Sequence, residues 1–136
     1  MKTISEAFKT KKLKIAYFMA GDPDLKTSEG LIEKIAGHFD IIELGAPFSD
    51  PIADGITIQK AALRSMKNKI TIEDLFSIVS HLRKKNLQNP IITMLYYNLI
   101  LQYGLEKFAD GLVKNGLNGA LVPDLPLEES EELLAH

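Results

Sequence analysis

The chain of 136 residues contains no cysteine and no long apolar run. Without cysteine it can form neither a disulfide nor a thiolate metal site. No segment approaches the roughly 18 apolar residues that a membrane span requires. The apolar stretch near the N-terminus is broken at Gly21 and Asp22, before it reaches the length of a signal-sequence core. We therefore expect a cytoplasmic protein.

An excess of charge of one sign is also missing. The chain has 16 basic and 18 acidic residues, a net charge of -2, and its Lys and Arg residues are scattered. This balance argues against nucleic acid or an anionic membrane as the main partner, and favours a small molecule or a protein. With 46% hydrophobic residues, a chain of this length can bury a core as one ordinary domain.

Four short apolar runs, rich in β-branched and aromatic residues, are typical of strands. Each run is continuous rather than alternating, which predicts a strand covered on both faces. The predicted strands are Lys14 to Met19, Asp40 to Leu44, Ile91 to Tyr96 and Gly119 to Val122.

Helical patterns lie between these runs and before the first. Strands that alternate with helices predict parallel (β/α) units, an α/β fold with a parallel sheet. The patterns are a short helix over Ile4 to Phe8, a stripe from Leu31 to Ala36 before Gly37, a stripe from Leu75 to Leu82 behind a Thr71 and Asp74 capping box, and a stripe from Leu105 to Val113 closed by Gly116.

The second unit is about twice as long as its neighbours, because the runs start at residues 14, 40, 91 and 119. The additional residues, Gly45 to Asn68, contain the loop GAPFSDPIADG and a further helical stretch over Ile58 to Met66. Ligands bind outside the carboxyl ends of parallel strands, so we expect function in this loop.

The last residues, PLEESEELLAH, are typical of a helix that has just begun, with Pro126 near its first turn. We therefore expect residues 1–136 to form a single domain that belongs to a longer chain and is truncated within or before its fourth helix. Such a structure would leave one edge of the sheet unpaired and inner apolar side chains uncovered.

Glu43 is the sharpest candidate for chemistry. In the run DIIEL, the two-residue period puts Ile41 and Glu43 on one face and Ile42 and Leu44 on the other. A carboxylate at the end of a buried strand is either neutralised by a raised pKa or paired with a cation. It is thus a candidate general acid or base, or half of a structural salt bridge to a lysine on a neighbouring strand.

Asp54 lies eleven residues further on, in a loop with Pro47, Asp50 and Gly55. Alone, it is typical of a turn. With Glu43, it could provide a second carboxylate on a mobile loop for two-point proton transfer, and two carboxylates could also bind Mg²⁺. No histidine is placed for a hydrolase triad, and the glycines form no nucleotide-binding motif.

Polar residues also follow the other strands. Asp22 follows the first, Asp124 follows the fourth, and Tyr96, Tyr97 and Asn98 end the third. The two aspartates have an ordinary interpretation as turn residues. The tyrosines and the amide could line an apolar pocket with one polar anchor, or pack in the core.

The segment Glu43 to Gly55, ELGAPFSDPIADG, followed by TIQKAALR, resembles the signature of the tryptophan synthase alpha subunit family. The segments AGDP, YYNL and LVPDLPLEES occur in the order and spacing of that family. The resemblance covers the chain from about residue 10. It implies the first four (β/α) units of a (β/α)8 TIM barrel, in an enzyme that cleaves indole-3-glycerol phosphate to indole and glyceraldehyde 3-phosphate without cofactor or metal.

By matching positions, the resemblance implies that Glu43 is the acid/base at indole C3 and the side-chain hydroxyl, and that Asp54 holds the indole N–H. Further positions are implied to line the indole pocket, namely Tyr17, Tyr96 and Asp124. Others are implied to contact the beta subunit in a heterotetramer of two alpha and two beta chains, namely Pro47, Asp50 and Asn98. The family's phosphate site, after strands seven and eight, has no counterpart here.

Two other functions are open. The chain could be a non-catalytic half-barrel that docks to or activates a partner, although intact carboxylates at Glu43 and Asp54 argue against lost catalysis. It could also be another lyase or isomerase of phosphorylated sugars, because a fold does not fix its chemistry. A Schiff-base aldolase would need a lysine at a strand end, and none of the predicted strands ends in one.

Overall fold

The computed structural model describes residues 1–9 and 12–136. Strands and helices alternate in it as the sequence predicts. The elements are α1 (Ile4–Ala7), β1 (Ile15–Met19), α2 (Leu25–Ile35), the 3-10 turn η1 (Ala36–His38), β2 (Ile41–Gly45), α3 (Ile56–Met66), α4 (Ile72–Lys84), β3 (Ile91–Met94), α5 (Tyr97–Tyr103), α6 (Leu105–Asn115), β4 (Gly119–Leu121), the 3-10 turn η2 (Leu127–Glu129) and α7 (Glu131–Leu134).

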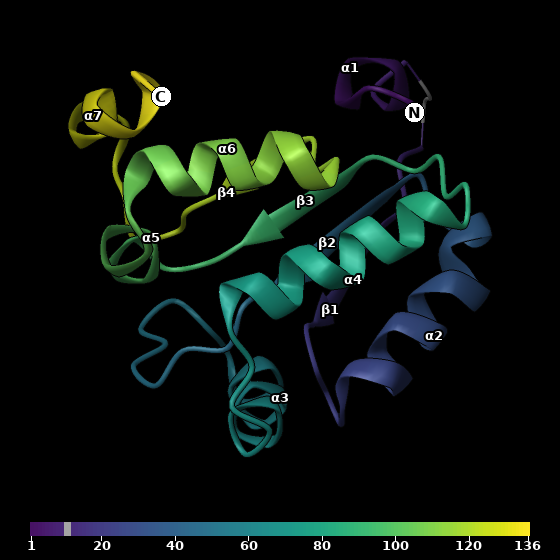
Figure 1. The fold of residues 1–136 in the computed structure, drawn as a ribbon, viewed down its shortest axis with the longest axis horizontal. Coiled ribbons are helices and arrows are strands. Elements are labelled where there is room, and N and C mark those ends of the chain that lie inside the picture. Colours follow the sequence, from purple (N-terminus) through teal and green to yellow (C-terminus); the bar gives the residue numbers. More distant parts are fainter. Residues whose placement is uncertain (10–11) are drawn as a thin grey trace.

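The four strands form one parallel sheet in the order β1-β2-β3-β4, so every strand lies beside its neighbour in the sequence. Helices α2, α4 and α6 lie over one face of this sheet (Figure 1). Parallel neighbours require a crossover, and each of these helices supplies one. The predicted (β/α) architecture is therefore confirmed.

Local sequence signals set the limits of the helices. Thr71 and Asp74 form the predicted capping box of α4, with each side chain accepting the other residue's backbone N–H. Gly116 ends α6 in the left-handed conformation, with φ 78°. Helix α3 occupies the predicted extra stretch of the long second unit. No helix in the described ranges is both long and apolar enough to cross a membrane.

The main core lies between the sheet and its helices. Ile42, Leu44 and Ile91 are completely buried there. The opposite face of the sheet is less covered than the continuous apolar runs predict, because Ile15 of β1 is 48% exposed and Leu121 of β4 is 40% exposed. These two residues lie on the outer strands, where the sequence predicts uncovered side chains. The prediction of cover on both faces is wrong for these edges.

The end of the third strand also differs from its prediction. Strand β3 ends at Met94, and Tyr97 and Asn98 begin helix α5 instead of ending the strand. The segment from Ile91 to Tyr103 is almost continuously apolar, and such a run cannot be divided into strand and helix by periodicity alone. Gly104, with φ 98°, then separates α5 from α6.

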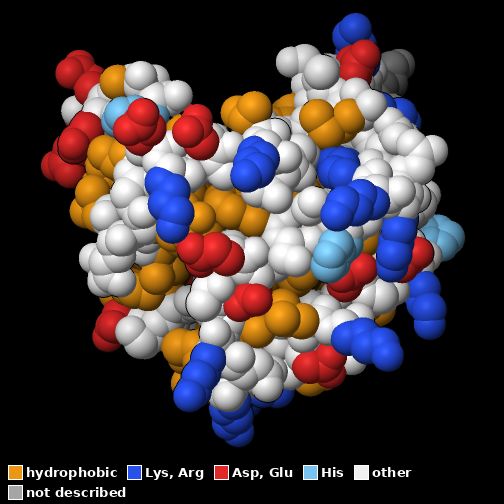
Figure 2. Space-filling model, in the orientation of Figure 1, with side chains coloured by type: hydrophobic (Ala, Val, Ile, Leu, Met, Phe, Trp, Pro, Cys, Tyr) orange, Lys and Arg blue, Asp and Glu red, His pale blue; other side chains and the backbone are white. Residues whose placement is uncertain are grey.

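The outer surface carries both signs of charge. Lys85 on α4 lies 3.1 Å from Glu29 and 2.7 Å from Glu33 on α2, and Lys107 on α6 lies 3.2 Å from Glu73 on α4. Figure 2 shows basic and acidic side chains interspersed over these helices. This face therefore has no stripe of one charge that would attract a nucleic acid or a membrane.

Candidate active site

The candidate site lies where the carboxyl ends of the parallel strands meet. Strand β2 carries Glu43 near its end, and the loop from residue 46 to 55 that follows it carries Asp54. Asp124 follows β4 at the same end. In parallel α/β sheets this end is where ligands bind. The topology thus places at one end of the sheet three carboxylates that the sequence separates by up to 81 positions, from 43 to 124.

Glu43 projects from the face of the sheet that is opposite the helices. Its neighbours in the strand, Ile42 and Leu44, point into the main core, and Glu43 pairs in register with Tyr17 on β1 and Ile92 on β3. The side chain is half-buried, and burial raises the pKa of its carboxyl. It makes no hydrogen bond or ion pair with any residue in the described ranges, so the alternative of a lysine salt bridge finds no support there.

Tyr17 lies beside Glu43 and leans over Gly45. A Cβ atom on Gly45 would lie 2.6 Å from Cζ of Tyr17 and closer still to its hydroxyl, so the ring occupies the space that any other residue would fill. Burial raises the pKa of the Tyr17 phenol, and the carboxylates of Asp54 and Glu43 raise it further. The phenol therefore keeps its proton, and both carboxylates are close enough to act on it.

Tyr96, the N-cap of α5, holds the loop that carries Asp54. Its hydroxyl accepts a hydrogen bond from the Ala53 backbone N–H at 2.9 Å, and its ring stacks on Phe48 with a centroid distance of 5.0 Å. Burial raises the pKa of the Tyr96 phenol, to which the Asp54 carboxylate also contributes. The Tyr96 side chain thus connects the residues after β3 to the loop at two points, Phe48 through its ring and Ala53 through its hydroxyl.

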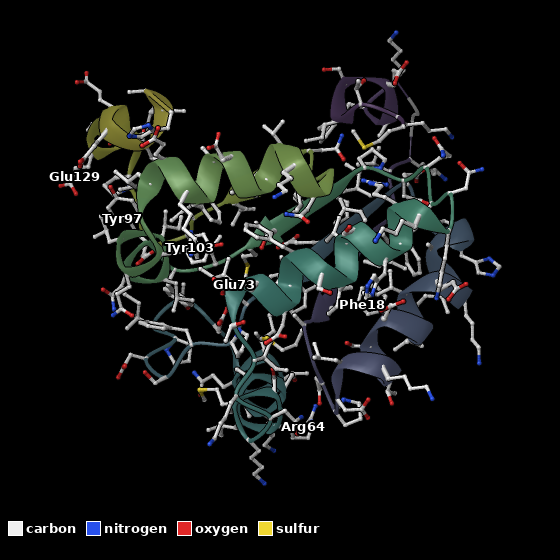
Figure 3. The ribbon with its side chains drawn as sticks, in the orientation of Figure 1. Phe18, Arg64, Glu73, Tyr97, Tyr103 and Glu129 are labelled. Carbon is white, nitrogen blue, oxygen red and sulfur yellow. The ribbon has the colours of Figure 1, made fainter. Side chains whose placement is uncertain are left out.

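Asp124 and Asp22 have structural partners. Asp124 accepts a hydrogen bond from the Tyr97 backbone N–H at 2.9 Å, and so fixes the start of α5 to the loop after β4. Asp22 receives two hydrogen bonds, at 2.8 and 2.7 Å, from Arg64 on α3. Figure 3 labels Arg64 on this helix. These contacts support the interpretation of both residues as structural, and Asp124 also lies at the candidate site.

The residues proposed to contact a partner subunit lie on the rim of the site. Asp50 and Asn98 are exposed, and Pro47 is half-buried. Because Phe48 stacks on Tyr96, the loop that contains Pro47 and Asp50 lies against the start of α5, where Asn98 is found. The three residues therefore lie on neighbouring segments at the same end of the sheet.

Sequence reasoning overlooked Gly45 and Phe48. The sequence places Gly45 only at the start of the long loop, whereas in the structure it provides the space for Tyr17. The signal that could have indicated this contact is the large side chain of Tyr17 on one strand and the missing side chain of Gly45 on the next. The described residues contain no group of three or more His, Cys, Asp or Glu side chains that could hold a metal ion.

Loss of the Tyr96 hydroxyl is expected to loosen the loop. We predict that Tyr96→Phe lowers the free energy of unfolding by about 1 kcal/mol, because the Ala53 N–H loses its acceptor. Hydrogen exchange of the Ala53 amide should accelerate. The control is Tyr103→Phe, the same change at the far end of α5 (Figure 3). Equal exchange of Ala53 in both variants would contradict the predicted role.

Comparison with known proteins gives the family. A family model described as tryptophan synthase alpha chain matches residues 4–136. The tryptophan synthase alpha chain of Petrotoga mobilis is 44% identical over 99% of this chain and 52% of its own length. That of Methanocaldococcus jannaschii is 42% identical over 92% of this chain and 44% of its own length.

Solved structures agree. The tryptophan synthase complex from Pyrococcus furiosus matches with a TM-score of 0.86 and 38% identity, over 90% of this chain and 51% of the other. Tryptophan synthase subunit alpha from Legionella pneumophila matches with a TM-score of 0.87 and 35% identity, over 95% of this chain and 50% of the other. The chain spans about half the length of these relatives. From residue 4 to its last residue, this chain belongs to the tryptophan synthase alpha chain family.

Proposed function

We propose that this chain provides the acid and base groups of an alpha subunit that cleaves indole-3-glycerol phosphate to indole and glyceraldehyde 3-phosphate. The observation that carries the proposal is the environment of Glu43, a half-buried carboxyl with a raised pKa and no protein partner in the described ranges. A structural carboxylate would be paired, whereas a carboxyl that moves protons must be free to meet its substrate.

The reaction divides between the two carboxylates. Cleavage requires that the side-chain hydroxyl lose a proton and that indole C3 gain one. The ring nitrogen carries positive charge after C3 is protonated and until the C–C bond breaks. Glu43, on a rigid strand, would move the protons. Asp54, on the loop tied down by Tyr96, would accept the indole N–H and stabilise the positive charge. Tyr17, Tyr96 and Asp124 would surround the indole ring.

The same proposal assigns a partner. A structure of the Pyrococcus furiosus relative is described as a tryptophan synthase a2b2 complex. We propose that Pro47, Asp50 and Asn98 contact a beta subunit, since they lie on the exposed rim around the candidate site. Indole released at Glu43 would then leave toward that subunit.

Indole release tests the proposal. We expect an alpha chain of full family length that begins with these 136 residues to form indole from indole-3-glycerol phosphate. Residues 1–136 alone should form little or none, because the phosphate-binding loops implied by the resemblance follow strands seven and eight. Absence of indole formation by the full-length chain would contradict the proposed function. Turnover by residues 1–136 at the full-length rate would contradict the proposal that the phosphate-binding part of the site lies in later residues.

A further inference from the structure

The Tyr17 hydroxyl is in an unusual position for a buried polar group. Tyr17 pairs in register with Glu43, yet its hydroxyl lies over Gly45, two residues nearer the carboxyl end of β2. Two residues of a strand span roughly 6.6 Å. The ring therefore leans from the middle of the sheet toward the loop of Asp54, and its hydroxyl lies beyond the Glu43 backbone on the side from which a ligand would enter.

This hydroxyl has no hydrogen-bond partner. Among residues 1–9 and 12–136, it is the one buried side-chain oxygen or nitrogen for which no partner is found. Buried polar groups are almost always paired, because an unpaired one destabilises the folded state. An unpaired hydroxyl at the mouth of a candidate active site therefore points to an acceptor that the ligand supplies.

The surrounding charges determine what that acceptor can be. The carboxylates of Asp54 and Glu43 both act on the phenol and favour its protonated form, so its O–H can donate a hydrogen bond and its oxygen can accept one. A ligand donor would use only the oxygen lone pairs and would leave the O–H without an acceptor. To pair the O–H, the ligand must present an oxygen or nitrogen lone pair near Tyr17 and the two carboxylates.

We infer that the Tyr17 hydroxyl donates a hydrogen bond to the side-chain hydroxyl oxygen of the substrate, the same oxygen whose proton Glu43 removes. This inference rests on the proposed function and adds a third catalytic residue to it. It concerns the hydroxyl of Tyr17 rather than the ring, which packs over Gly45.

The role follows from the electron balance of the cleavage step. The O–H bond breaks, its proton goes to the Glu43 carboxylate, and its electron pair forms the carbonyl of the aldehyde product. The C–C bond breaks, and its electron pair remains with indole C3, which is protonated. Negative charge gathers on the substrate oxygen during this step, and a donor already aimed at that oxygen stabilises it.

The test separates the hydroxyl from the ring. In an alpha chain of full family length that begins with these 136 residues, Tyr17→Phe should lower kcat/KM for indole-3-glycerol phosphate about tenfold. The inhibition constant of an analogue with both side-chain hydroxyls replaced by hydrogen should change less than twofold. Tyr103→Phe, the matched control on α5, should change neither value. The thermal midpoint of Tyr17→Phe should equal or exceed that of the parent.

The possible failures are distinguishable. If the parent chain forms no indole, both the proposed function and this inference are wrong. If the parent is active and Tyr17→Phe keeps kcat/KM within twofold, only the inference is overturned. Equal losses for substrate and deoxygenated analogue would indicate a packing role, and a lower thermal midpoint would indicate a protein partner for the hydroxyl. Either result would also overturn the inference.

Discussion

Glu43→Gln should lower the rate of indole release at least about 1,000-fold in an alpha chain of full family length that begins with these residues. Glutamine has nearly the same shape but can neither accept nor return a proton, and general acid–base catalysis contributes about 10² to 10⁴ at each transfer. Glu106→Gln on the exposed first turn of α6 is the matched control and should keep full activity. A Glu43→Gln variant that retains a tenth of the parent rate would exclude Glu43 as the proton carrier.

The same variant should change how stability depends on pH. Burial raises the pKa of Glu43 above its usual 4.5, so the folded state binds this proton more tightly than the unfolded state. Well below pH 4.5 the carboxyl is protonated in both states, so its burial does not reduce the free energy of unfolding. As the pH rises from about 4.5 through the raised pKa, the unfolded state ionises first and the folded state loses stability relative to it. Glutamine avoids this loss.

Urea unfolding at two pH values measures this difference. Glu43→Gln should have a higher midpoint than the parent at about pH 7, and the two midpoints should converge at about pH 4. A lower midpoint for the variant at about pH 7 would show that the ionised carboxylate has a stabilising partner. That outcome would favour the salt bridge over the acid and base role.

Gly45→Ala should damage both the fold and the site. The new Cβ would lie 2.6 Å from Cζ of Tyr17 and inside contact distance of its hydroxyl, so the ring must move. Overpacking of this kind costs about 1–3 kcal/mol of unfolding free energy. Because the displaced ring would enter the space between Glu43 and Asp54, turnover should also fall about 100-fold.

Two further variants make the Gly45 prediction specific. Gly30→Ala lies within α2 with no atom within 4 Å of the added methyl, and it should raise stability by up to about 1 kcal/mol. Tyr17→Phe combined with Gly45→Ala removes the closest atom but leaves Cζ, so it should recover part of the lost stability. A double variant that is no more stable than Gly45→Ala alone would contradict the clash with the hydroxyl.

Local patterns were enough to predict most of the scaffold. The two-residue period of DIIEL placed Glu43 on the face opposite Ile42 and Leu44, and the structure confirms that face. The spacing of Thr71 and Asp74 predicted the capping box that begins α4. These features depend on residues within one element, where periodicity and capping chemistry are direct signals.

Features that depend on contacts between elements were not predictable in the same way. Helix α5 was missed because its apolar residues continue those of β3. The position of Tyr17 over Gly45 depends on the register of two strands, and the bond from Ala53 to Tyr96 spans 43 positions of sequence. Neither the register of two strands nor the position of a loop can be predicted from the sequence of one segment alone.

The strand order β1-β2-β3-β4 also has a consequence for synthesis on the ribosome. Each strand pairs with one that left the ribosome before it, so none has to wait for a distant partner or be inserted between strands already paired. Tyr96 is the last residue needed to fix the loop of Asp54 beside Glu43. The carboxylate pair can therefore take its final arrangement while later residues are still being translated.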